Sequence, residues 1–174
     1  MTREYLKKAK KSAEESLSDV RNTVQDILKK IEFGGEITAK EIALKLDKYE
    51  GNIVLTPDEI ATAKEKVSQR IKDDIRFAYD NVKKFALAQK NTLQDFNIEV
   101  VPEFFLGQKY IPCKSVGCYI PGGRYSHVAS AIMTVTTAKV AGCDHIAACS
   151  PPRPSTGINP AIVYTADLCG ADVI

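Results

Sequence analysis

Apolar residues recur every three or four positions along the first part of the chain, the spacing of one face of an α-helix. The clearest run is followed by Gly34-Gly35, and because glycine commonly ends helices, we expect a helix over residues 4–33. The apolar positions of this run are Leu17, Val20, Val24, Ile27, Leu28 and Ile31.

Two capping signals predict further helices. Thr38 and Glu41 have the spacing of a capping box, in which each side chain accepts a hydrogen bond from the other residue's backbone. Thr56-Pro57-Asp58-Glu59 is a stronger signal, because Thr56 can cap the helix and Pro57 has the fixed φ that suits a first helical residue. From Pro57 we expect two helices that reach residue 91, joined or kinked near Lys72.

Beyond residue 95 the pattern changes to short apolar runs that alternate with helical segments. Gly142 and Gly170 are placed as helix ends, and Asn159-Pro160 as a helix start. This order predicts an α/β fold, in which a helical N-terminal region over residues 1–95 precedes the start of a Rossmann-like, doubly wound parallel sheet over residues 96–174. The expected strands are 97–101, 115–120, 145–149 and 171–174, and the expected helices are 128–140 and 160–168.

The last predicted strand, residues 171–174, coincides with the end of the chain. A central parallel strand needs neighbouring strands and helices on both faces of the sheet. We therefore expect the α/β domain to be incomplete and the chain to be the front portion of a longer polypeptide. The alternative is that 174 residues close a complete small fold.

Charge and composition exclude several classes of protein. The formal net charge of +2 does not indicate a nucleic-acid partner. The longest apolar stretch, residues 129–149, is interrupted by Lys139 and Asp144, so we expect no membrane-spanning helix. The five cysteines include no CxxC pair, which favours a reducing cytoplasm over a disulfide framework.

The segment Tyr119-Ile-Pro-Gly-Gly-Arg lies at the carboxyl end of a predicted strand and before a predicted helix. Ligands of open α/β sheets bind at this position. Glycines let the backbone approach a phosphate closely, and the helix start offers N–H donors. The spacing is not that of GxGxxG, so a simple turn remains the alternative.

Arg124 and His127 flank this turn and form a cationic pair suited to an anionic group such as a carboxylate or a sulfonate. The alternative is a surface arginine and a histidine with only a local structural role. The two histidines do not form HxxxH, and no Ser-His-Asp or Cys-His arrangement is recognisable. The residues alone therefore predict neither a metal site nor a catalytic constellation in this chain.

Residues 119–152, YIPGGRYSHVASAIMTVTTAKVAGCDHIAACSPP, resemble the histidinol dehydrogenase family. Residues 158–174, INPAIVYTADLCGADVI, continue the resemblance to the end of the chain. The earlier segments DVRNTVQDILKKI and LTPDEIATAKEKV are similar in layout to the leading region of that family. The resemblance covers most of this chain and well under half of the usual length of the family.

The resemblance implies a zinc- and NAD-dependent enzyme that oxidises a small primary alcohol to a carboxylate by two hydride transfers. It implies that Tyr119, Pro121, Gly122 and Gly123 contact NAD and that Ser130 lies near the substrate. It also implies a cytoplasmic homodimer whose zinc ligands and Glu-His general base lie beyond residue 174. No catalytic residue or metal ligand is therefore assigned within this chain.

Arg124-Tyr125-Ser126-His127 and the segment ACSPPRPSTGINPAIVY are more similar to the sulfopropanediol 3-dehydrogenase branch of the family. Members of that branch oxidise sulfopropanediol to sulfolactate, and a sulfonate requires cationic donors. We therefore expect Arg124, His127 and Ser130 to contact the substrate. Histidinol oxidation is the alternative, and a non-catalytic chain that acts in binding or assembly is a further one.

Overall fold

The computed structural model describes residues 14–122, 125–154 and 156–174. The chain divides into two compact units, Met1–Ile42 and Ala43–Ile174. The second unit contains the α/β segment together with helices that precede it in the sequence. The predicted division into residues 1–95 and 96–174 remains a prediction about the domains of the protein.

The first helix, α1, spans Glu14–Asp47 and is interrupted at Gly35, whose φ of 60° and ψ of −147° are not helical. A residue with a side chain is strained at this φ, so the glycine permits the kink. The predicted helix end at Gly34-Gly35 therefore corresponds to a break between two helical stretches. The prediction that the next helix starts at Thr38 is wrong, because the helical backbone resumes directly after Gly35.

Helices α2, Pro57–Glu65, and α3, Gln69–Lys90, follow in the second unit. The predicted capping box is confirmed: the Glu59 amide donates to the Thr56 hydroxyl over 3.3 Å, and the Thr56 amide donates to the Glu59 carboxylate over 2.7 Å. The break between the helices lies just before Ser68, which caps α3, and not near Lys72 as predicted.

Strands β1, Phe96–Val101, and β2, Phe104–Gln108, pair antiparallel as a hairpin. The prediction for β1 is confirmed, whereas β2 was not predicted. The turn of the hairpin is Pro102-Glu103, and Glu103 has a φ of 68°. A hairpin turn is recognised in a sequence by glycine or asparagine at the position of positive φ. Because this position holds a glutamate, the sequence does not indicate the turn.

The remaining elements follow the predicted order, except that the predicted strand 171–174 is present only as an isolated bridge at Val173. Strand β3, Ser115–Tyr119, pairs in parallel with β4, His145–Cys149, and α4, Val128–Ala141, connects them. Helix α5, Pro160–Cys169, leads to Val173, which forms a parallel bridge with Ala147 of β4. Each connection is therefore a βαβ crossover, which joins parallel strands.

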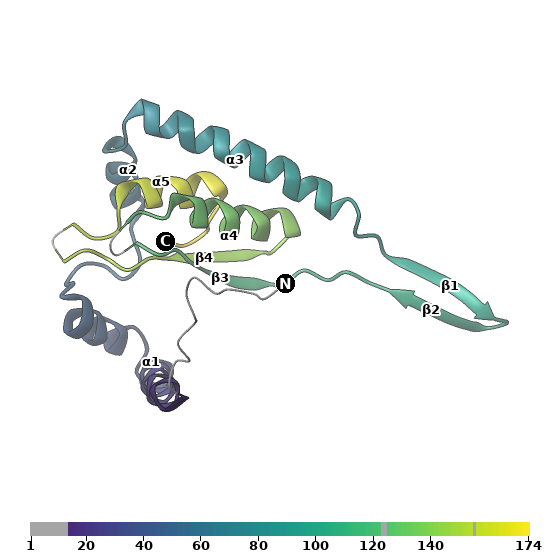
Figure 1. Ribbon diagram of the computed structural model, residues 1–174, viewed down its shortest axis with the longest axis horizontal. Coiled ribbons are helices and arrows are strands. Elements are labelled where there is room, and N and C mark those ends of the chain that lie inside the picture. Colours follow the sequence, from purple (N-terminus) through teal and green to yellow (C-terminus); the bar gives the residue numbers. More distant parts are fainter. Residues whose placement is uncertain (1–13, 123–124, 155) are drawn as a thin grey trace, which may run out of the picture. The chain divides into compact units, whose positions relative to one another are not determined.

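The helices of the second unit form layers on the β3–β4 sheet (Figure 1). Helix α4 packs on both strands and beside α5, whereas α3 packs against α4, and α2 against α5. The predicted fold class, a helical region followed by the start of a Rossmann-like parallel α/β sheet, is confirmed. The predicted ends of α4 and α5 are also confirmed, because Gly142 and Gly170 cap them in the left-handed backbone conformation, with φ of 97° and 94°.

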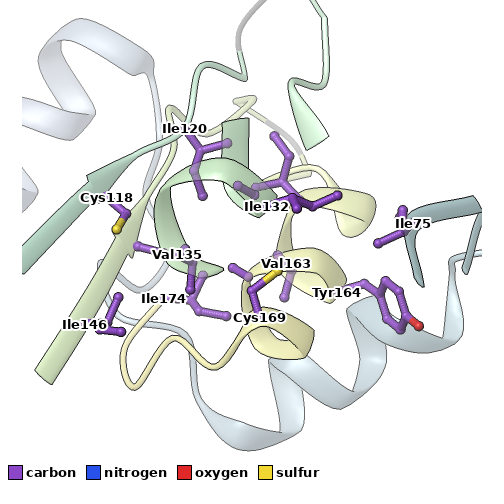
Figure 2. Close-up of a cluster of buried hydrophobic side chains, with 14 of the residues drawn as sticks. Ile75, Cys118, Ile120, Ile132, Val135, Ile146, Val163, Tyr164, Cys169 and Ile174 are labelled. Carbon is purple, nitrogen blue, oxygen red and sulfur yellow. The ribbon is translucent and has the colours of Figure 1, made fainter. Parts of the chain in front are cut away.

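A hydrophobic core fills the space between the sheet and the helices (Figure 2). Val135 from α4 and Ile146 from β4 are completely buried, and Val163 from α5 is 1% exposed. Tyr164 and Ile75 extend the core between α5 and α3. The core therefore fixes the sheet, α4 and α5 as one packed body.

Side chains alternate between the two faces of the sheet, and the two faces differ in burial. Cys118, Ile146 and Ala148 point into the core and are buried. Within the described part of the second unit, α4 is the helix that packs closely on β3 and β4, on the buried side, and we call the opposite side the open face. It comprises Ser115, Gly117, Tyr119, His145, Ala147 and Cys149.

Candidate functional site

The candidate site lies where β3 and β4 end side by side. Tyr119 and Cys149 are the last residues of the two strands and are paired in register. The Ile120 amide donates to the Cys149 carbonyl over 2.8 Å, which extends the ladder by one hydrogen bond. Because the pairing is parallel, both following loops leave the sheet at the same edge, where α/β proteins bind ligands.

Gly122 packs closely against the loop that follows β4. A Cβ atom at this position would lie 2.4 Å from the Ser150 Oγ and 3.3 Å from the Ile162 Cδ1. The Ser150 Oγ is itself buried and has no hydrogen-bond partner among the described residues. A side chain at this position would displace the Ser150 side chain, so the glycine lets the two loops pack closely at the carboxyl edge.

The loop after β3 returns directly to the start of α4. The His127 amide donates to the Pro121 carbonyl over 3.2 Å, and the Ser130 amide donates to the His127 carbonyl over 3.0 Å. His127 is the N-cap residue of α4, and its side chain makes no capping hydrogen bond. The first backbone amides of α4 are thus directed toward the carboxyl edge without a side-chain cap, an arrangement that favours anions.

A cavity of about 310 Å³ lies at this edge, within the second unit. Its floor includes the ends of both strands, and its wall comes from the end of α1 and the segment after it. Tyr49 lies in this wall, and its hydroxyl donates to the Asn52 carbonyl over 3.3 Å. The lining residues are Ala43, Asp47, Tyr49, Asn52, Ile53, Leu55, Tyr119, Cys149, Ser150, Pro151, Pro152 and Ile158.

The lining is mainly apolar and aromatic, with a few polar groups from Asp47, Asn52 and Ser150. Ligand pockets for cofactors combine these features, because the apolar walls exclude water and the polar groups fix the orientation of the ligand. Tyr119 is 63% exposed and presents its ring on the open face. The cavity can therefore hold a flat, partly apolar group such as a nucleotide base.

Cys149 is the thiol of the cavity. Partial burial raises the pKa of Cys149, and the neighbouring Cys118 thiol raises it further. A thiol is a much weaker nucleophile than a thiolate. At neutral pH Cys149 therefore lines the cavity as a neutral thiol and is not an activated nucleophile.

The structure places five of the seven predicted site residues around this edge. Tyr119 is exposed, Pro121 half-buried and Gly122 buried, whereas His127 is exposed at the start of α4 and Ser130 is half-buried in its first turn. Gly123 and Arg124 lie outside the described residues. The contacts predicted for these seven residues with coenzyme and substrate remain predictions.

Sequence reasoning missed Tyr49 and Ser150. Ser150 directly follows a predicted strand, so the rule that ligands bind at carboxyl ends could have indicated it. Tyr49 is 70 residues from Tyr119 in the sequence, and no local pattern connects the two. Only the folded chain brings both to one cavity.

The described residues contain no cluster of three or more histidine, cysteine, aspartate or glutamate side chains that could hold a metal ion. They therefore do not fit the zinc ion that the family resemblance implies, and we derive no step through zinc. None of the helices in the described ranges is both long and apolar enough to cross a lipid bilayer.

The parallel β3–β4 sheet, its βαβ connection and the cavity at its carboxyl edge define an α/β protein with the start of a Rossmann-like sheet. A sequence model of the histidinol dehydrogenase family matches residues 10–174. The chain belongs to the histidinol dehydrogenase family.

Relatives of known name support this assignment. The chain is 60% identical over its full length to sulfopropanediol 3-dehydrogenase from Ruegeria pomeroyi. It is 50% identical over 98% of its length to a histidinol dehydrogenase homolog from Pelagibacter ubique. The chain spans 40% of the length of each of these two proteins.

A solved structure has the same fold. The crystal structure of histidinol dehydrogenase from Elizabethkingia anophelis superposes with a TM-score of 0.80 at 30% sequence identity. The superposition covers 96% of this chain and 36% of that structure. The architecture described above therefore corresponds to about a third of a histidinol dehydrogenase subunit.

Proposed function

We propose that the complete protein is an NAD-dependent alcohol dehydrogenase and that Tyr119, Pro121 and Gly122 hold part of the coenzyme. The observation that carries this proposal is the cavity at the carboxyl edge of β3 and β4, which the exposed Tyr119 lines. The loop with Gly122 and the start of α4 follow Tyr119 at the same edge of the sheet, outside the lining of the cavity. Family membership supports the reaction class.

Each of these features has a task in binding a dinucleotide. The Tyr119 ring and the apolar walls provide a surface against which a flat ring can stack. The backbone amides at the start of α4 can donate to a phosphate oxygen. Because Gly122 has no Cβ, the loop can lie against Ser150 and Ile162 without displacing either side chain.

NAD, when bound, accepts a hydride from the carbinol carbon of the substrate. An alcohol loses its hydroxyl proton to a base in the same step and becomes an aldehyde. Conversion of the hydrated aldehyde to the carboxylate would require a second equivalent of the coenzyme as hydride acceptor and a base for the released proton. The described residues contribute coenzyme positioning to this sequence of steps, and we assign the base and any metal ligands to none of them.

For the substrate we propose sulfopropanediol, because the relative from Ruegeria pomeroyi that carries this name is 60% identical over the whole chain. In the sequence that follows Gly122, Arg124 provides a cationic donor and His127, exposed at the start of α4, an imidazole that can donate a hydrogen bond. Histidinol is the alternative substrate, since other members of the family bear that name. Comparison of kcat/KM for the two alcohols with NAD decides between them.

Protection of Cys149 tests the coenzyme site. Cys149 lines the cavity, whereas Cys113 is also exposed and lies outside it. We expect NADH to slow the alkylation of Cys149 in the complete natural polypeptide at least about fivefold and to leave Cys113 unchanged. The reaction is followed by peptide mass spectrometry at mildly alkaline pH, because the raised pKa of Cys149 slows its reaction at neutral pH.

Equal alkylation rates of Cys149 with and without NADH would show that the coenzyme does not bind in this cavity. Slow oxidation of both alcohols, combined with normal NADH protection, would favour the alternative of a chain that acts in binding or assembly. The alkylation experiment thus tests where the coenzyme binds, and the oxidation rates test which reaction the protein catalyses.

A further inference from the structure

A separate cavity of about 260 Å³, which we call the helix cavity, lies where α3, α4 and α5 meet. Helix α3 packs on α4 and α5 on the side away from the sheet (Figure 1). The helix cavity shares no lining residue with the cavity at the carboxyl edge. Its lining residues are Tyr79, Lys83 and Leu87 from α3, Thr136, Lys139 and Val140 from α4, and Cys169 from α5.

Thr136 brings a buried hydroxyl to the helix cavity. It is 1% exposed, and its Oγ1 atom has no hydrogen-bond partner among the described residues. Other threonines of α4 and α5 donate to the carbonyl four residues earlier, namely Thr134, Thr137 and Thr165, over 2.8, 2.6 and 2.6 Å. A buried hydroxyl without a partner has lost its hydrogen bonds to water, so the Thr136 hydroxyl is available to a ligand that enters the cavity.

The Cys169 thiol is the polar neighbour of this hydroxyl. Cys169 is 2% exposed, and burial raises the pKa of its thiol, whereas the Thr136 hydroxyl lowers that pKa in part. A neutral thiol is only a weak hydrogen-bonding group. It therefore leaves the Thr136 hydroxyl able to donate to an oxygen atom of a ligand.

The charged residues in the lining are both lysines, and none of the described lining residues is a carboxylate. The Lys83 ammonium donates to the Tyr79 hydroxyl over 3.0 Å, and the Lys139 ammonium lies 3.8 Å from the carboxylate of Asp172, which is outside the lining. An ammonium group carries several donors, so each lysine has donors beyond these contacts. Two cations beside a buried hydroxyl favour an oxyanion.

We propose that the helix cavity binds a small organic oxyanion, a carboxylate or a sulfonate with a short aliphatic part. Lys83 and Lys139 balance its charge, and the Thr136 hydroxyl donates to one of its oxygens. Leu87 and Val140 contact the aliphatic part. Pockets for drug-sized ligands have about 300–1,000 Å³, so a cavity of about 260 Å³ suits a smaller molecule. The proposal goes beyond the proposed dehydrogenase function and does not depend on it.

Calorimetric titration of propanesulfonate into the complete natural polypeptide tests the lysines. We expect saturable binding, and Lys83→Gln combined with Lys139→Gln should raise the dissociation constant at least about tenfold. Lys84→Gln combined with Lys90→Gln is the matched control outside the lining and should change it less than about twofold. Absence of saturable binding, or equal weakening by both pairs of substitutions, would overturn the site.

Inorganic sulfate is the comparison ligand, because it carries the charge without an aliphatic part. We expect sulfate to bind the unsubstituted protein more weakly than propanesulfonate does, since Leu87 and Val140 then lack a partner. Equal affinity for the two anions would overturn the assignment to an organic ligand.

Thr136→Val distinguishes a ligand-binding hydroxyl from a structural one. Valine has nearly the same shape and removes a hydroxyl that has no partner, so the unfolding temperature without ligand should stay equal or rise. The dissociation constant for propanesulfonate should rise at least about tenfold. Thr137→Val, whose hydroxyl bonds Met133 instead, should leave that constant within about twofold. Unchanged affinity in Thr136→Val, or a lower unfolding temperature without ligand, would overturn the proposal.

Discussion

Ile146 in β4 and Ile98 in β1 are the same residue type at interior positions of short strands, yet Ile146 is fully buried and Ile98 is 53% exposed. The difference arises from what covers each strand. Helix α4 packs on one side of the β3–β4 sheet with α5 beside it, whereas among the described residues no helix packs closely on the β1–β2 hairpin. An apolar strand thus contributes to the stability of a unit only when another element covers its face.

The sharpest way to measure this difference is to shorten both isoleucines. Ile146→Ala should lower the free energy of unfolding by about 3 kcal/mol, because it leaves a cavity in a closed core. Ile98→Ala should lower it by less than about 1 kcal/mol in a monomeric sample, since its side chain is already half in water. Urea denaturation monitored by circular dichroism measures both values, and equal losses would contradict the contrast.

A glycine within β3 and a glycine in the loop that follows it give a second comparison. Gly122→Ala should cost about 1–2 kcal/mol, because the new Cβ would lie 2.4 Å from the Ser150 Oγ. Gly117→Ala should be close to neutral, since no atom lies within 4 Å of its Cβ position on the open face. Both are measured by thermal unfolding.

The double variant Gly122→Ala/Ser150→Ala is the control, since it removes the clashing oxygen and should recover part of the loss. A large cost at Gly117 in the complete natural polypeptide would show that further chain covers the open face there.

A substitution in the turn of the β1–β2 hairpin should have a smaller effect on stability. Glu103 has a φ of 68°, a region that a glycine adopts without strain, and its amide donates to the Glu99 carboxylate over 2.7 Å. Glu103→Gly keeps this hydrogen bond and relieves the backbone, which should stabilise the hairpin by about 0.5 kcal/mol. Hydrogen exchange in β2 should slow about twofold, and faster exchange would show that the glutamate side chain supports the turn.

The smallest effect concerns the start of α2 at low pH. Hydrogen bonds from the Thr56 amide, the Asn52 amide and the Thr56 hydroxyl lower the pKa of Glu59 below 4.5. A lowered pKa means that the stabilisation is complete above pH 4.5 and is lost as the pH falls below it. Glu59→Gln should therefore flatten the acid side of the stability profile slightly, and an unchanged profile would show that the charge of the Glu59 carboxylate contributes nothing measurable.

The same contrast explains which elements the sequence predicted. Helices with start or stop residues in their own sequence were predicted correctly, because these residues act through local backbone geometry. The start residues are Pro57 and Pro160, and the stop residues are Gly142 and Gly170. Strand β2 was missed, since its Phe-Phe-Leu-Gly-Gln sequence does not alternate and its turn lacks glycine.

The candidate site was predicted in part for the same reason. The loop after β3 was found from residues adjacent in sequence, and its position at the carboxyl edge is confirmed. Tyr49 and the cavity were not found, because a cavity depends on segments that meet only after folding. The cavity is lined by groups from distant parts of the sequence, so the sequence could indicate the edge but not the shape of the site.

The central claim is that the edge marked by Tyr119 receives the nicotinamide dinucleotide, and calorimetric titration of NADH into the complete natural polypeptide tests it most directly. Tyr110, 44% exposed at the other end of the β3 segment, provides the matched control. We predict that Tyr119→Ala weakens NADH binding at least about tenfold, as expected for the loss of a stacking aromatic, whereas Tyr110→Ala changes it less than about twofold. Equal NADH affinity for the Tyr119→Ala variant and the unsubstituted protein would contradict the account.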